Sequence, residues 1–160
     1  MQFIKTAAIG AILSLTALMP SAYAVKNGQK FKAWEGKCTK IDKQNICGIT
    51  QTISDADKNP VVNIFIRKIK GQKNPIAFVK VPLGVNLQAG LGFAVDKKEF
   101  AQVPYTVCDP AGCNAIFPVT NEIAEKMKKG SKLQVGMMLG SQALYEEGSL
   151  SGFTNALKAL

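Results

Sequence analysis

Residues 104–119 read PYTVCDPAGCNAIFPV and place a cysteine at each end of a short turn. The four residues from Asp109 to Gly112 fit a type I turn, because aspartate favours its first position, proline its second and glycine its fourth. Such a turn brings Cys108 and Cys113 side by side, within reach of a disulfide bond. The segments on either side, EFAQVPYTVC and GCNAIFPV, are predicted to be strands that the turn joins.

The chain has four cysteines, Cys38, Cys47, Cys108 and Cys113, and no histidine. Four cysteines allow three disulfide pairings, and their spacing favours the two neighbouring couples. The alternative of a zinc site is disfavoured, since structural zinc sites usually space cysteines two to four apart and often add histidine. A redox couple is also disfavoured, because neither couple has the Cys-x-x-Cys spacing.

The first 24 residues have the pattern of a secretory signal peptide. Lys5 supplies a basic start, an uncharged apolar run follows, and Ala22 and Ala24 give the small residues of a cleavage site. The alternative is an N-terminal membrane anchor, but the apolar run is shorter than the roughly 20 residues that span a bilayer comfortably. We expect cleavage near Ala24 and one exported domain over residues 25–160, without a transmembrane segment.

The chain is basic, with a formal net charge of +9 that falls to +8 without Lys5. This charge favours contact with anionic surfaces such as lipid headgroups or acidic glycans, although a solvated lysine surface without a ligand is the alternative. Arg67 is the only arginine. Because nucleic-acid recognition relies on arginine forks and stacked aromatic side chains, a nucleic-acid partner is not predicted.

The lack of histidine removes the Ser-His-Asp and Cys-His arrangements and every histidine-ligated metal site. Glu146 and Glu147 are adjacent in a predicted strand and should point to opposite faces. The glycines near residues 84–92 precede no helical pattern, so they do not form a nucleotide-binding loop. We therefore predict no catalytic, cofactor-binding or metal-binding residues and a protein that is not an enzyme.

Short apolar segments separated by turn residues predict an all-β sandwich or barrel. The segment PVVNIFIRKIK is apolar on both faces at its start and is placed inside a sheet. Thr120 can cap a short helix over NEIAEKMKK, which Gly130 ends. Within this helix, Glu122–Lys126 and Glu125–Lys129 are predicted i,i+4 ion pairs. A second short helix follows Ser151, and its apolar face is formed by Phe153, Leu157 and Leu160. The predicted strands cover residues 31–39, 45–53, 60–70, 75–82, 89–96, 99–108, 112–119, 132–139 and 142–150.

Several blocks together resemble the bacterial invasion-associated locus B family: WEGKC, ICGITQ, VPLGVNLQAGLGFAVD, VPYTVCDPAGCNA and GSLSGFTNALKAL. The resemblance runs from about Lys30 to the end of the chain. It implies a periplasmic or secreted β-sandwich of immunoglobulin-like build, with disulfides Cys38–Cys47 and Cys108–Cys113. It also implies an association with host-cell invasion and virulence, without catalytic residues. The loops SDADKNPV and RKIKGQKNP match no block, so binding specificity is expected there.

These observations predict an exported, non-enzymatic envelope or secreted protein that acts by binding a protein or an anionic surface. A periplasmic chaperone or assembly factor that uses an exposed sheet edge is the first alternative. A histidine-free hydrolase with a Ser-Lys or carboxylate site is the second. The candidate contact residues are Lys68, Lys70, Lys73, Lys80, Lys126, Lys128 and Lys129.

Overall fold

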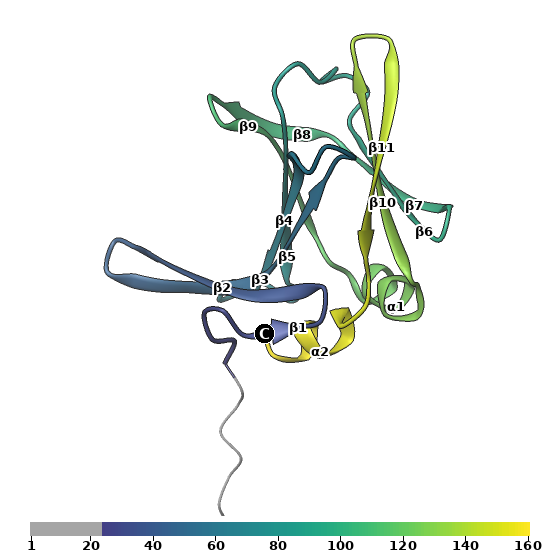
Figure 1. Ribbon diagram of the computed structural model, residues 1–160. Coiled ribbons are helices and arrows are strands. Elements are labelled where there is room, and N and C mark those ends of the chain that lie inside the picture. The colour runs from purple at the N-terminus through teal and green to yellow at the C-terminus, as the bar shows by residue number, and fades with distance from the viewer. Residues whose placement is uncertain (1–23) are drawn as a thin grey trace, which may run out of the picture.

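The computed structural model describes residues 24–160, which form two antiparallel β-sheets and two short helices (Figure 1). The larger sheet has seven strands in the order β1-β2-β3-β4-β5-β9-β8. Its strands are β1 Lys30–Phe31, β2 Trp34–Ile41, β3 Gln44–Ser54, β4 Pro60–Arg67, β5 Ile76–Val81, β8 Tyr105–Asp109 and β9 Gly112–Pro118.

The smaller sheet has four strands in the order β11-β10-β6-β7. Its strands are β6 Leu91–Val95, β7 Lys98–Val103, β10 Lys132–Leu139 and β11 Gln142–Ser149, and the helices are α1 Asn121–Lys129 and α2 Phe153–Lys158. The predicted all-β sandwich with one internal and one C-terminal short helix is thus confirmed.

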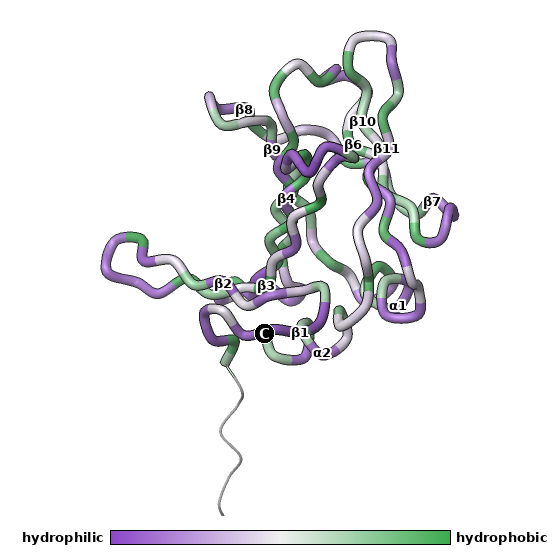
Figure 2. The backbone as a smooth tube through the Cα atoms, in the orientation of Figure 1, coloured by the Kyte–Doolittle hydropathy of each residue, from purple (hydrophilic) through white to green (hydrophobic). Residues whose placement is uncertain are grey.

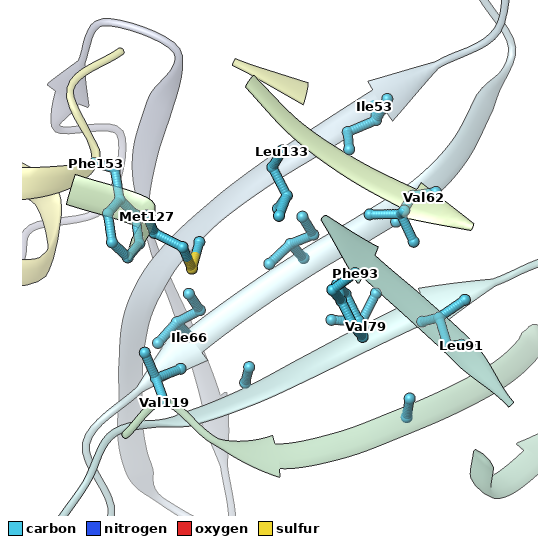
Figure 3. Close-up of a cluster of buried hydrophobic side chains, with 14 of the residues drawn as sticks. Ile53, Val62, Ile66, Val79, Leu91, Phe93, Val119, Met127, Leu133 and Phe153 are labelled. Atoms are coloured by element: carbon cyan, nitrogen blue, oxygen red, sulfur yellow. The ribbon is translucent and has the colours of Figure 1, made fainter. Parts of the chain in front are cut away.

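The core lies between the two sheets. Inward-facing residues alternate along β4, where Val62, Ile64 and Ile66 are buried, while Phe93 of β6 faces them from the other sheet (Figure 3). This alternation of buried residues follows from strand geometry, because every second side chain of a strand points to the same face of the sheet. As predicted, β4 lies inside a sheet, between β3 and β5. Its other face is only half-buried, at Phe65 for example, because no second layer covers it.

The predicted strand over residues 99–108 is wrong in one respect, since it is two strands in different sheets. β7 ends at Val103 in the smaller sheet and β8 begins at Tyr105 in the larger one. Pro104 lies between them and has no N–H to donate to a ladder, so pairing stops there and the chain crosses between the sheets. The predicted strand over residues 31–39 is also interrupted, because a turn at Lys32 and Ala33 separates β1, which ends at Phe31, from β2, which begins at Trp34.

Helix α1 begins as predicted, with the Thr120 side chain accepting a hydrogen bond from the Ile123 N–H. Met127 is buried against the core and Ile123 packs beside it. Gly130 ends the helix, and a Cβ there would lie 2.1 Å from Val95 Cγ1, so close packing requires glycine at that position.

The C-terminal helix is held by the only tryptophan. The Trp34 ring is fully buried, lies 5.1 Å from the Phe153 ring of α2 between centroids, and donates to the Ser149 carbonyl oxygen. Phe153, Leu157 and Leu160 were predicted to share an apolar face, and Phe153 is buried while the two leucines pack partly buried against the core. The stripe is therefore core packing.

The predicted signal peptide, residues 1–24, lies almost entirely outside the described residues. Val25, the predicted first residue after cleavage, is buried. Val25 and Lys26 pack closely against Gly36 of β2, where a Cβ would clash with the Lys26 carbonyl oxygen. Within residues 24–160, no helix has the length and hydropathy needed to cross a membrane.

Candidate binding surfaces

Two disulfides each link directly opposed residues on neighbouring strands. Cys38 of β2 is bonded to Cys47 of β3, and Cys108 of β8 to Cys113 of β9, with Cα–Cα distances of 4.1 and 4.0 Å. These are the neighbouring couples that the spacing favoured. Asp109 accepts a hydrogen bond from the Ala111 N–H within the turn between the second couple. All cysteines of the described part are bonded, so none of them is a thiolate ligand there.

Three of the candidate lysines lie close together in the loop between β4 and β5. Lys68, Lys70 and Lys73 are exposed and form no ion pair within residues 24–160. The end of this loop is fixed to the segment that follows β9, because the Val119 N–H donates to the Pro75 carbonyl oxygen at 2.8 Å.

The lysines of α1 are partly neutralised by glutamates of the same helix. Lys126 donates to Glu122 at 2.7 Å, as predicted, and this hydrogen bond lowers the pKa of the Glu122 carboxyl. The predicted pair Glu125–Lys129 is wrong. Glu125 instead accepts a hydrogen bond from Lys128, which lies three residues further along the helix and not four. Lys129 forms no ion pair in the described chain.

Lys80 stands apart from the other candidates. Its side chain points outward from β5, near the end of the strand that is remote from the β4–β5 loop. Ile76, where that loop ends, lies four residues before Lys80, or about 13 Å away along the strand. Its ammonium group lies 3.4 Å from the Asp109 carboxylate. The seven lysines therefore do not form one continuous face.

The outer face of the larger sheet has an aromatic cluster that sequence reasoning missed. Phe65 of β4 and Phe78 of β5 are cross-strand neighbours with ring centroids 6.3 Å apart, and the Arg67 guanidinium carbon lies 5.7 Å from the Phe78 ring. Ile116 of β9 continues the row beyond Phe78. The alternation of apolar residues on both faces of β4 was the signal for this cluster, but the register was needed to join its members.

The outer face of the smaller sheet contains a hollow of about 470 Å³. The sequence did not predict this hollow, although Gly92 is among the glycines that form no nucleotide-binding loop. The residues that line the hollow are Ala89, Gly90, Gly92, Phe93, Ala94, Lys97, Glu99, Ala101, Gln102, Gln134, Gly136, Met137, Met138, Ala143 and Tyr145.

The titratable groups with shifted pKa values do not converge on a reaction centre. The Lys132 ammonium donates to Glu147, lowering the pKa of that carboxyl and raising that of the lysine, and both groups lie on the surface. Burial raises the pKa of Tyr105, whose hydroxyl has no hydrogen-bond partner within the described residues. No group of three or more potential metal ligands occurs in the described part of the chain.

Two packed antiparallel sheets and two cross-strand disulfides define this chain as a disulfide-linked β-sandwich. The family model described as "Invasion associated locus B (IalB) protein" matches residues 34–160, and the chain belongs to this family. It is similar to the crystal structure of invasion associated protein B from Bartonella henselae, with a TM-score of 0.68 and 19% identity over 81% of this chain and 90% of that chain. At this identity the likeness shows the fold. No curated protein matches.

Proposed function

We propose that this member of the invasion-associated family is exported and acts without catalysis, by binding an anionic partner through the β4–β5 loop. The observation that carries the proposal is the exposure of Lys68, Lys70 and Lys73 on one short loop without acidic partners. Their charges are free to attract an anion, whereas Lys126 and Lys128 of α1 are partly neutralised by their own helix.

The disulfides support export and a rigid binding surface. Disulfide bonds persist in the periplasm and outside the cell and are rare in the cytoplasm. Core packing and the hydrogen bond from Val119 to Pro75 fix the end of the loop to the sandwich. A loop held on a rigid scaffold loses less conformational entropy on binding than a free segment does.

The experiment is a co-sedimentation assay of residues 25–160 with vesicles of phosphatidylglycerol and phosphatidylcholine, repeated on immobilised heparin at increasing salt. Replacing Lys68, Lys70 and Lys73 with glutamine should abolish most of the salt-sensitive binding. Replacing Lys37, Lys40 and Lys43 of the β2–β3 hairpin removes the same charge elsewhere and serves as the control. Equal losses in both variants would mean that net charge, and not this loop, causes binding.

A chaperone or assembly factor is the second candidate, because β8 is an edge strand with Val107 53% exposed. An unpaired edge can accept a strand from another protein. The pairing of β8 with β9 is, however, interrupted by a bulge between Tyr105 and Val107, and bulges blunt edges against such addition. Proline at Thr106 should reduce capture of periplasmic proteins by the tagged protein if this candidate is correct, and leave vesicle binding unchanged.

The hydrolase alternative receives no support from the shifted groups. It requires a lysine or carboxylate whose pKa is changed inside a pocket. The carboxyl groups with lowered pKa values, such as Asp55, Glu122 and Glu147, are all on the surface, and hydrogen bonds to neighbouring side chains or backbone cause the changes.

A further inference from the structure

The hollow on the smaller sheet is formed by missing side chains at its centre. On the outer face, one cross-strand row runs Gln102, Gly92, Gly136 and Tyr145 from β7 to β11. The two central members are glycines, and bare backbone at Gly92 forms the floor between Gln102 and the Tyr145 ring, which lies over Gly136. The volume of about 470 Å³ lies within the range of small-molecule sites, roughly 300–1,000 Å³.

The fold itself does not require glycine at position 92. A Cβ added there would meet only the Gly136 carbonyl oxygen, at 3.8 Å, which is ordinary contact. Gly136 differs, because a Cβ there would lie 3.0 Å from the Tyr145 ring, which covers that position. Glycine inside a strand lowers stability relative to residues with side chains, and it often marks a place where a ligand approaches the backbone closely. The open floor at Gly92 is therefore available to a ligand.

The walls of the hollow offer an aromatic surface and hydrogen-bond acceptors. Tyr145 is 68% exposed. Gln102 donates through Nε2 to the Ala89 carbonyl oxygen, and Gln134 donates through Nε2 to Glu147. These bonds orient both amides, and within residues 24–160 neither amide oxygen accepts a hydrogen bond, so both can accept one from a ligand.

The charge of the lining differs from that of the whole protein. Lys97 and Glu99 are its only charged residues, one of each sign. An anionic ligand would meet the Glu99 carboxylate, and a wholly apolar one would leave the amide oxygens of Gln102 and Gln134 without partners, which is costly. A ligand with many hydroxyl donors and one weakly polar face satisfies both features.

We propose that the outer face of the β6–β7–β10–β11 sheet binds a neutral sugar ring. The ring lies over Gly92 with its C–H face against Tyr145, and its hydroxyl groups donate to the amide oxygens of Gln102 and Gln134. Partly positive C–H groups suit the negative face of an aromatic ring. This site contains none of the seven candidate lysines and is independent of the anionic binding proposed above.

The test is an NMR titration of ¹⁵N-labelled residues 25–160 with chitotriose and with maltotriose, both neutral, and with the anionic trigalacturonate. At least one neutral sugar should shift the amide signals of Gly92, Gly136 and Gln134 at concentrations up to about 10 mM, a weak affinity that such an open site can supply. If neither neutral sugar shifts these signals, or if trigalacturonate shifts them more strongly, the proposal is wrong.

Variants separate this site from nonspecific binding. Gly92→Val places a side chain on the open floor and should weaken sugar binding at least about tenfold, whereas Asn114→Val, on the outer face of the other sheet, should not. Tyr145→Phe should retain binding and Tyr145→Ala should lose it, which gives a second test if Gly92→Val folds poorly. Unchanged binding in Gly92→Val and in Tyr145→Ala contradicts the proposal. So does sedimentation showing that this face joins two copies of the chain and that Gly92→Val separates them.

Discussion

The two sheets of this sandwich have similar inner faces and different outer faces. On the larger sheet, the rings of Phe65 and Phe78 cover each other and Arg67 lies over Phe78. On the smaller sheet, Gly92 leaves the corresponding surface open, while the Tyr145 ring covers the neighbouring Gly136. One face gains stability from contacts among its own side chains, while the other gives up such contacts and keeps space. The stabilising contacts of an outer face and the open volume thus lie on different sheets.

The largest loss of stability should come from a substitution on the inner face of the smaller sheet, at Phe93, the residue that follows Gly92. Phe93 is buried and its ring lies 4.9 Å from the Phe117 ring between centroids. Phe93→Ala should lower the free energy of unfolding by about 3–5 kcal/mol, since it leaves a cavity in the core. Urea denaturation followed by circular dichroism measures this loss. A loss below about 1 kcal/mol would mean that the smaller sheet contributes little to the core.

On the outer face of the larger sheet the effect should be intermediate. Phe78→Ala removes the ring contacts with Phe65 and Arg67 and should cost about 1–2 kcal/mol. Phe78→Leu is the control, because it keeps apolar volume and loses only the aromatic part. Thermal unfolding of both variants compares them. A neutral Phe78→Ala would remove the contrast between the two outer faces.

On the open face a substitution should not destabilise at all. Gly92→Ala should raise the free energy of unfolding by up to about 1 kcal/mol, because alanine is less flexible than glycine in the unfolded chain and its Cβ has room. Gly148→Ala is the contrasting control, since its Cβ would lie 2.3 Å from Gln51 Oε1 on the covered side of the sheet. Differential scanning calorimetry should show opposite shifts of the melting temperature. Destabilisation by Gly92→Ala would indicate that the fold does need glycine there.

The smallest effect concerns the charged rim of the smaller sheet. The hydrogen bond from Lys132 lowers the pKa of Glu147 below its ordinary value of 4.5. The contribution of Glu147 to stability is therefore present above its unfolded-state pKa and is lost as the pH falls through the lower folded-state pKa. Glu147→Gln should reduce stability slightly at neutral pH and not below the folded-state pKa. Because the pair is exposed, added salt should reduce the difference as well. A difference that persists at low pH would show that the ion pair is not its cause.

Much of the sandwich was predictable from local patterns. The turn at Asp109 and the cap at Thr120 depend on residues a few positions apart, and both were recognised. Pro104 was the residue that misled, because the apolar run through it looked continuous although proline cannot donate to a ladder. The pairing of Glu125 with Lys128 instead of Lys129 was missed because both positions lie on the same side of the helix as Glu125.

The sequence by itself determined the features whose parts are near one another along the chain: most of the strands, the capped helix and the two disulfide couples. Only the tertiary structure decided which residues that are far apart in the sequence share a surface. Gln102, Gly92, Gly136 and Tyr145 become neighbours through the registers of four strands, and the lysine groups separate because β5 carries Lys80 away from the loop. The physical reason is that hydrophobicity and turn chemistry act locally, whereas strand register sets which side chains share a surface.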